Sequence, residues 1–164
     1  MKKRLAAGAG AAFVLALAAA MSPAAAQVKI GALYPFSGAL ALLGDESFRG
    51  VELTVEERNA AGGLKGQKIE IVKGDAVDPS QAVGEARRLT SVEKVPAIFG
   101  TYSSSLSLAA TQVTELASIP YFELGAVSDP ITERGYKYVF RTNPTAKDFG
   151  AKTVDAVVEQ IGPA

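Results

Sequence analysis

Strand-like and helix-like segments alternate along most of this chain, and this alternation is the feature that most constrains its fold. Short runs rich in β-branched and aromatic residues are separated by longer amphipathic runs, several of which are bounded by capping residues and glycines. Units of this kind connect parallel strands through right-handed crossovers. The sequence therefore predicts an α/β fold built on a doubly wound parallel sheet.

The predicted segments can be placed on the chain. The expected strands are 28–34, 68–73, 96–100, 119–124 and 138–141. The expected helices are about 45–61, 79–92, 106–117 and 146–161, with one helical turn near Pro130 in a loop over 125–135. Asp78 followed by Pro79 is typical of a helix start. The segment 35–44 holds a proline and two glycines, so we expect it to be a loop.

Residues 1–26 are expected to be a cleaved secretory signal peptide and not part of the fold. Three basic residues precede an apolar run from Leu5 to Ala20, and Ala24-Ala25-Ala26 gives a small-residue cleavage pattern before Gln27. The alternative is an uncleaved membrane anchor. That alternative is weaker because the run is alanine-rich, shorter than a span of about 20 residues, and followed by a cleavage site.

Composition excludes several kinds of chemistry. Residues 1–26 hold three basic residues and no acidic one, so the remainder has 14 basic and 17 acidic residues, a net charge of −3. A mildly acidic domain without a basic cluster is a poor candidate for binding nucleic acid. The chain has no histidine and no cysteine, which excludes zinc sites, thiol nucleophiles, disulfides and histidine-based triads within it. We expect no metal and no cofactor.

Three adjacent serines give the strongest candidate site. In doubly wound sheets, ligands bind beyond the carboxyl ends of the strands, so the loops after the first, third and fourth strands matter most. Ser103-Ser104-Ser105 lies between the third strand and the next helix. Hydroxyls and free N–H groups at a helix N-terminus suit an anion such as a carboxylate. The alternative is an ordinary N-cap, but three hydroxyls exceed what capping needs.

Motifs spread over the whole segment after residue 26 resemble one family. The glycine loop, the Gly-Asp helix start, Asp-Pro-x-Gln-Ala, Gly-x-x-Ser-Ser and Arg-Thr-x-Pro occur in this order. In this combination the chain resembles the amino-terminal lobe of the periplasmic leucine/isoleucine/valine-binding family of ABC-importer receptors. The resemblance implies a type I clamshell with two Rossmann-like lobes, a periplasmic location and an inner-membrane permease as partner. It also implies that 27–164 is a partial N-terminal lobe without the second lobe.

The same resemblance assigns roles to four positions. It implies that Ser104 binds a ligand carboxylate, with Ser105 as a secondary contact. Gly125 matches a residue whose carbonyl binds the ligand ammonium in the amino-acid binders. Val127 stands where those proteins have a threonine or serine hydroxyl. The lost hydroxyl leaves two ligand classes open, branched-chain amino acids and acids without an ammonium group. The alternatives are a turn glycine at 125 and a core valine at 127.

Three further residues are candidates with competing structural roles. Leu43, in the expected loop after the first strand, matches a position where relatives place an aromatic residue against the ligand, although loop anchoring is as good an explanation. Tyr102 is either a pocket wall or a core residue. Glu123 ends the fourth strand, where it either pairs with a cationic ligand group or is solvated or paired with Arg134 or Arg141. We favour the solvated or paired state.

The sequence therefore predicts a periplasmic receptor for branched-chain amino acids or a related small carboxylate, which delivers its ligand to an ABC importer. One alternative is a periplasmic ligand sensor on the same fold. Another is a binder of aromatic or aliphatic acids or of amides. An enzyme is the weakest class, because the chain has neither the G-x-G-x-x-G nor the G-x-S-x-G motif.

Overall fold

The computed structural model describes residues 27–162, which form a five-stranded parallel sheet between helices. The strands are β1 (Val28–Tyr34), β2 (Ile69–Asp75), β3 (Ile98–Gly100), β4 (Tyr121–Glu123) and β5 (Val139–Arg141). Their order in the sheet is β2-β1-β3-β4-β5, and every neighbouring pair is parallel. The predicted doubly wound α/β fold is confirmed. The predicted signal peptide, 1–26, lies outside the described residues.

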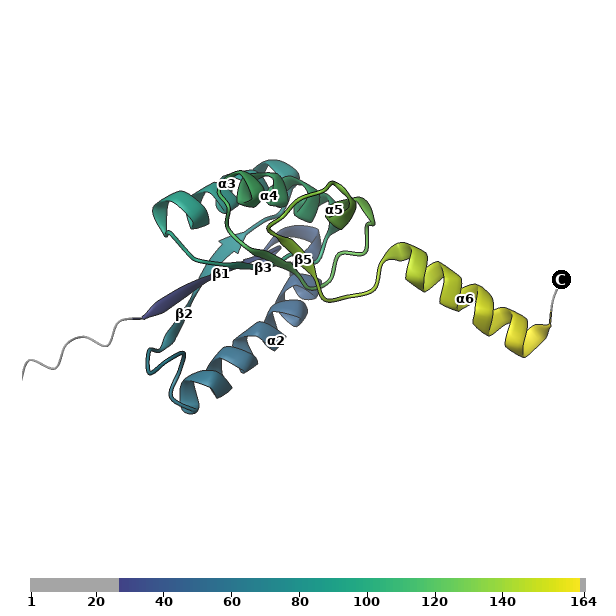
Figure 1. Ribbon diagram of the computed structural model, residues 1–164, viewed down its shortest axis with the longest axis horizontal. Helices are drawn as coiled ribbons and strands as arrows, with labels where there is room; N and C mark the ends of the chain where they lie inside the picture. Colours follow the sequence, from purple (N-terminus) through teal and green to yellow (C-terminus); the bar gives the residue numbers. More distant parts are fainter. Residues whose placement is uncertain (1–26, 163–164) are drawn as a thin grey trace, which may run out of the picture.

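Helices cover both faces of the sheet (Figure 1). The 3₁₀ helix η1 (Gly38–Leu40) and α2 (Ala41–Ala60) lie on one face. The opposite face carries α3 (Pro79–Arg87), which continues as the π-helical η2 (Arg88–Val92), together with α4 (Ser104–Leu116) and α5 (Pro130–Glu133). The last helix, α6 (Ala146–Ile161), extends away from the sheet in Figure 1. Within residues 27–162, no helix is both long and apolar enough to cross a membrane.

The main core lies between the sheet and the α3–α4 layer. Its fully buried members include Leu33, Leu89, Ile98 and Tyr121. The α2 face has a smaller core, in which Phe48 packs edge-on against Tyr34 and Phe36. An apolar cavity of about 490 Å³ remains between α2 and the sheet on this side. The larger core therefore lies on the α3–α4 side of the sheet.

The expected loop over 35–44 is wrong, because helical structure begins there at Gly38 and α2 begins at Ala41. Leu43 therefore lies in the first turn of α2 and not in a loop. The glycine at 44 was the misleading signal. It is buried against the backbone of Pro35, where a side chain would overlap the Pro35 carbonyl oxygen. Gly44 thus allows a close approach of helix and loop and does not end the helix.

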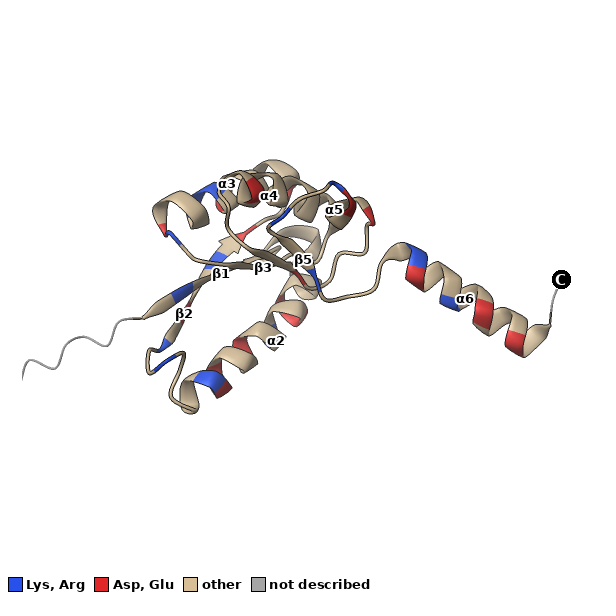
Figure 2. Cartoon of the chain, in the orientation of Figure 1, with Lys and Arg blue, Asp and Glu red and all other residues tan. Residues whose placement is uncertain are grey.

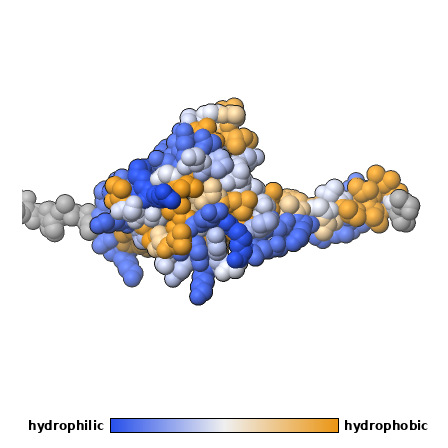
Figure 3. Space-filling model, turned by 90° about the horizontal axis from the view of Figure 1, so that it is seen from above, coloured by the Kyte–Doolittle hydropathy of each residue, from blue (hydrophilic) through white to orange (hydrophobic). Residues whose placement is uncertain are grey.

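Helix α6 buries none of its residues. Thr145 and Asp148 form a capping box that fixes its start. Phe149, Val157 and Ile161 are exposed on it, and apolar surface gathers near its C-terminal end in Figure 3. Charged residues of both signs occur along the helix and over the rest of the molecule in Figure 2. An amphipathic helix with an exposed apolar stripe is typical of a segment that packs on further protein.

Candidate functional site

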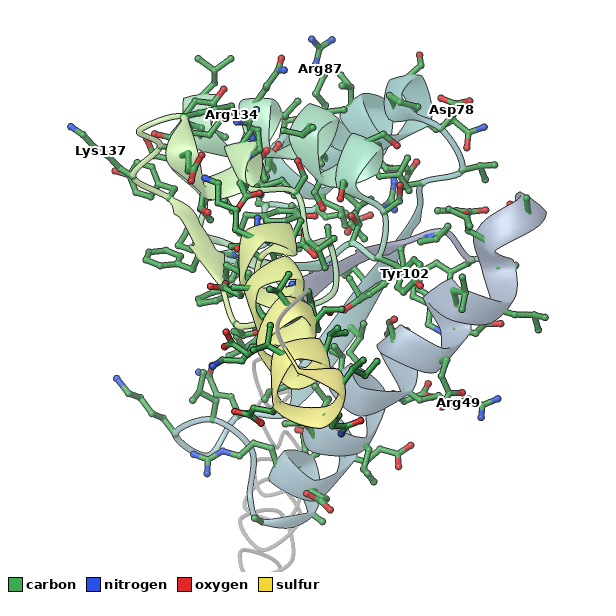
Figure 4. All side chains as sticks on the ribbon, turned by 90° about the vertical axis from the view of Figure 1, so that its right-hand side faces the viewer. Arg49, Asp78, Arg87, Tyr102, Arg134 and Lys137 are labelled. Carbon is green, nitrogen blue, oxygen red and sulfur yellow. The ribbon has the colours of Figure 1, made fainter. Side chains whose placement is uncertain are left out.

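The carboxyl ends of β1 and β3 mark the point where the strand order reverses. From β1 the chain runs to β2 on one side and then to β3 on the other, so the crevice of the doubly wound sheet opens between the loops that follow β1 and β3. Figure 4 looks at this end of the sheet, where Tyr102 lies between α2 and the helices of the opposite face. The candidate residues can be placed relative to this crevice.

Ser104 begins α4, and its hydroxyl bridges to the loop after β4. Ser104 Oγ accepts a hydrogen bond of 3.3 Å from the backbone N–H of Ser128. Because that bond uses a lone pair, the hydroxyl proton stays free to donate to a ligand. Ser104 is partly exposed. The third and fourth strands thus bring together two loops that are far apart in the sequence.

The serine hydroxyls at the start of α4 do not cap the helix. Ser103 is the N-cap residue, yet its side chain makes no capping hydrogen bond. Ser103 Oγ instead lies 3.1 Å from the Oγ of Ser105, which is exposed. The first N–H groups of a helix have no acceptor inside it. In the part of the chain described here, the N–H groups of Ser104, Ser105 and Leu106 donate to no other residue.

Tyr102 and Gly125 also meet at this point. A methyl group placed on Gly125 would lie 3.5 Å from the Cα of Tyr102, so the two loops touch through their backbones. Gly125 has no positive φ, which removes the turn-glycine explanation, and a methyl group here would make only ordinary van der Waals contacts, so the packing does not require glycine. Val127 is 36% exposed, so it is not a core residue. Tyr102 is partly buried, which is compatible with both of its predicted roles, a pocket wall and a core residue.

Leu43 stands apart from the other candidates. It is 44% exposed on the first turn of α2. It does not line the apolar cavity beneath α2, and neither do the other six candidates. The structure therefore gathers Tyr102, Ser104, Gly125 and Val127 around the β3 and β4 loops and leaves Leu43 on a separate element.

Glu123 is buried and differs from the expectation that it is solvated or paired with an arginine. It has no exposed surface. Its Oε1 accepts from the N–H groups of Gly125 (2.9 Å) and Ala126 (2.7 Å), and its Oε2 accepts from the Thr101 N–H (3.3 Å) and from the Ser107 hydroxyl. One carboxylate therefore joins the β3 loop, helix α4 and the β4 loop.

The two arginines expected to pair with Glu123 have other partners. Arg141 donates to the carbonyls of Ala126 (2.9 Å) and Ser128 (2.5 Å). Arg134 donates to the carbonyls of Pro130 and Leu108 and stacks over Tyr136, at the outer side of the α4 layer in Figure 4. The expectation failed because both guanidinium groups donate to backbone carbonyls, and that of Arg134 also donates to the Thr111 hydroxyl. Residues 125–128 are thus held by a carboxylate on one side and a guanidinium on the other.

Asp75 plays a matching role at the end of β2. Its Oδ1 accepts from the N–H groups of Phe36 (2.8 Å) and Ser37 (3.2 Å), and its Oδ2 accepts from the Ser37 hydroxyl (2.5 Å). Neither Asp75 nor this role of Glu123 was predicted. The available signal was an acidic residue as the last residue of a strand, at the edge where the crevice forms.

Burial raises the pKa of Glu123, and the hydrogen bonds from Ser107 and from the N–H groups of Ala126, Gly125 and Thr101 oppose that rise. A carboxyl group with a raised pKa in the folded state stabilises the fold below its unfolded-state pKa of about 4.3. That contribution is lost as the pH rises through the folded-state pKa.

The free energy of unfolding of the wild type, minus that of Glu123→Gln, is therefore expected to fall as the pH rises from 4 to 7. The subtraction removes the contributions of Glu93 and Asp148, whose pKa values are lowered by their hydrogen-bond partners. Urea unfolding of both proteins at each pH measures the difference. A difference that grows with pH would instead show that the folded state favours the ionised form of Glu123 and lowers its pKa.

Comparisons with known proteins agree with this architecture. Residues 27–164 match the family model described as periplasmic binding protein. The chain is 60% identical over 150 residues to Leu/Ile/Val-binding protein homolog 7 of Brucella suis, covering 92% of this chain and 38% of that protein. It is 60% identical over 144 residues to Leu/Ile/Val-binding protein homolog 8 of the same organism, covering 88% of this chain and 36% of that protein. The chain thus spans well under half the length of these relatives.

Two groups of solved structures share the fold. The branched-chain amino acid transporter substrate-binding protein LivJ of Streptococcus pneumoniae, in complex with isoleucine, matches with a TM-score of 0.76 and 31% identity, over 82% of this chain and 38% of that one. A solute-binding protein of an ABC transporter of Rhodopseudomonas palustris, in complex with p-hydroxybenzoic acid, matches with a TM-score of 0.74 and 26% identity, over 82% and 36%.

Proposed function

This chain belongs to the periplasmic binding protein family, and on that premise we propose that it forms one lobe of a receptor for a small carboxylate-bearing solute. The first candidates are branched-chain amino acids. Under this proposal residues 1–26 direct secretion and are removed, and 27–164 is the N-terminal ligand-binding lobe. The loaded receptor delivers its ligand to an ABC permease in the inner membrane.

The start of α4 is the observation that carries the proposal. Its serine hydroxyls are not used for capping, and its first N–H groups have no acceptor within residues 27–162. Helix α4 has 13 residues, so its dipole adds a partial positive charge where these groups converge. A ligand carboxylate supplies the acceptors and the negative charge that this end of the helix lacks.

A second ligand class is supported by Val127. The amino-acid binders have a hydroxyl at this position that contacts the ligand ammonium, and this chain has none. A ligand without an ammonium group therefore fits this lobe better than it would fit those proteins. The Rossmann-like neighbours include proteins in complex with p-hydroxybenzoic acid. Aromatic acids are therefore the second candidate ligands. A periplasmic sensor, the alternative function, would use the same lobe and bind the same ligands but would not deliver them to a permease.

In the proposed mechanism, one lobe binds the ligand first and a second lobe closes over it. The carboxylate contacts at α4 orient the ligand, and closure then removes it from water, as in hinge-closing binding proteins. Figure 1 shows that α6 leads the chain away from the lobe at the crevice end of the sheet. In this mechanism, the capped start of α6 would place the link between the two lobes beside the ligand.

A thermal-shift screen of the complete gene product tests the function. The screen contains leucine, isoleucine, valine, other amino acids, 4-hydroxybenzoate, aliphatic carboxylates and simple amides. A ligand at 100 times its Kd stabilises the folded state by about 2.7 kcal/mol, which raises Tm by several degrees. Stabilisation by a carboxylate supports the receptor. Stabilisation by amides alone would reject the carboxylate site.

Ser104→Ala is expected to weaken binding of the ligand identified in that screen by about tenfold, because it removes a hydrogen bond to a charged group. Calorimetric titration measures the Kd. Ser91→Ala is the matched control, since Ser91 is exposed and donates to the Arg87 carbonyl at the far end of α3. Equal Kd values for wild type and Ser104→Ala would remove Ser104 from the site.

A further inference from the structure

Glu123 fixes the direction of two peptide groups in the loop after β4. The N–H groups of Gly125 and Ala126 both donate to the same oxygen, Oε1, at 2.9 and 2.7 Å. These N–H groups belong to the Leu124–Gly125 and Gly125–Ala126 peptide units. The one cis peptide bond in the described part of the chain is Gly100–Thr101, so both units are trans.

In a trans peptide unit the carbonyl points opposite to the N–H group. The carbonyls of Leu124 and Gly125 therefore point away from the buried carboxylate. No residue between 27 and 162 donates a hydrogen bond to either oxygen. The next carbonyl, that of Ala126, differs in receiving Arg141 and Asn143, each at 2.9 Å. Two adjacent carbonyls are thus left as open acceptors.

The charge of Glu123 makes these two carbonyls better acceptors for a cation. Three of its four partners are N–H groups, which can only donate, and this arrangement fits an ionised carboxylate. A carboxylate that accepts from an amide N–H polarises the amide and increases the negative charge on its carbonyl oxygen. Because Glu123 has no exposed surface, water screens its field weakly.

The open carbonyls adjoin the start of α4. Gly125 packs against the backbone of Tyr102, two residues before Ser104, and Ser104 itself contacts the N–H of Ser128. One side of this junction offers free N–H groups and a hydroxyl, and the other offers two polarised carbonyls. A ligand with a carboxylate and an ammonium group on neighbouring atoms matches both sides.

We propose that Glu123 is a positioning residue that determines specificity, acting through the Leu124 and Gly125 carbonyls to select ligands that carry an ammonium group beside their carboxylate. The inference rests on the proposed receptor function and narrows it to α-amino acids. It also accounts for Val127. The missing hydroxyl is offset by the buried negative charge of Glu123, which orients and polarises the two carbonyls.

The test compares L-leucine with 4-methylpentanoate, which is leucine without its amino group. Both are titrated calorimetrically into the complete gene product and its variants. Glu123→Gln keeps an oxygen that can accept from Gly125 and Ala126 but removes the charge. We expect it to weaken leucine binding at least tenfold and to change 4-methylpentanoate binding less than threefold, or to strengthen it.

Glu115→Gln is the matched control. Glu115 also accepts from two backbone N–H groups, those of Lys137 and Tyr138, each at 2.9 Å, at the other end of α4. It should leave the preference for leucine unchanged. A second variant, Val127→Thr, covers the case in which Glu123→Gln does not fold. It adds a hydroxyl at an exposed position beside the carbonyls, and we expect tighter leucine binding with no change for 4-methylpentanoate.

The outcomes separate the inference from the function. If Glu123→Gln weakens both ligands equally, Glu123 does not select an ammonium group. If Val127→Thr alters both equally, the loop after β4 does not contact the ammonium group, and Glu123 cannot act through it. If the wild type binds 4-methylpentanoate or 4-hydroxybenzoate but not leucine, the inference is overturned and the carboxylate receptor stands. If the wild type binds no carboxylate at all, the proposed function fails, and the inference fails with it.

Discussion

Ser107→Ala is expected to lower the free energy of unfolding by about 3 kcal/mol, because it takes a hydrogen bond from a buried charge. Ser107 has no exposed surface, donates to Glu123 and lies 2.5 Å from the Thr101 hydroxyl. Neither neighbour can reach water to replace the lost partner. Urea unfolding of the wild type and the variant measures the loss.

Thr114→Val is the control for this prediction. Thr114 is also fully buried on α4, but its hydroxyl bonds only to the Thr111 carbonyl of the same helix, at 3.3 Å. Valine keeps the shape of the side chain, so a loss under about 1 kcal/mol is expected. Similar losses for the two variants would mean that every buried hydroxyl on α4 contributes about equally to the free energy of unfolding. The hydrogen bonds to Glu123 would then add no extra stability.

Gly44→Ala should destabilise the fold by about 3 kcal/mol, although alanine is the better helix former. The added methyl group would overlap the carbonyl oxygen of Pro35, which belongs to the rigid loop after β1. Overpacking against backbone costs about 1 to 3 kcal/mol or more, because the helix or the loop must shift. The expected result is a lower urea midpoint with an unchanged m value.

Gly50→Ala gives the opposite expectation in the same helix. Nothing lies within 4 Å of a methyl group placed on Gly50. The change should therefore stabilise the protein by up to about 1 kcal/mol, through helix propensity alone. If both glycine variants were stabilised, helix α2 would not approach Pro35 as closely as described, and its first turn would lie elsewhere.

Local signals were enough to predict most of the fold. Asp78 caps α3 through a bond from the Gln81 N–H, with Pro79 at the first helical position, as its sequence predicts. The helical turn at Pro130–Glu133 and the helix Ala146–Ile161 also occur where they were expected. These elements depend on capping chemistry and periodicity, which act within a few residues. The parallel direction of the strands followed from the alternation itself, because crossover helices join parallel strands. The order β2-β1-β3-β4-β5 was not predicted.

Features that depend on distant contacts were missed or misread. Gly44 was interpreted as a loop glycine, since its contact with Pro35 exists only after α2 folds back on the loop. Glu123 was interpreted as solvated or paired with Arg134 or Arg141, since its partners at Thr101 and Ser107 come from the preceding βα unit. The local sequence around an acidic residue does not indicate whether its side chain is buried. The serines of the candidate site were predicted because helix starts are local features.

Amide NMR spectra of the complete gene product, recorded with and without L-leucine, test the central claim most directly. The claim is that the ligand carboxylate binds at the start of α4. We expect the largest shifts at the amides of Ser104 and Ser105, smaller ones at Gly125 and Val127, and none at Lys94 or Ser118 at the opposite end of the sheet. Shifts centred on Val51 and Leu64, which line the apolar cavity beneath α2, would contradict it.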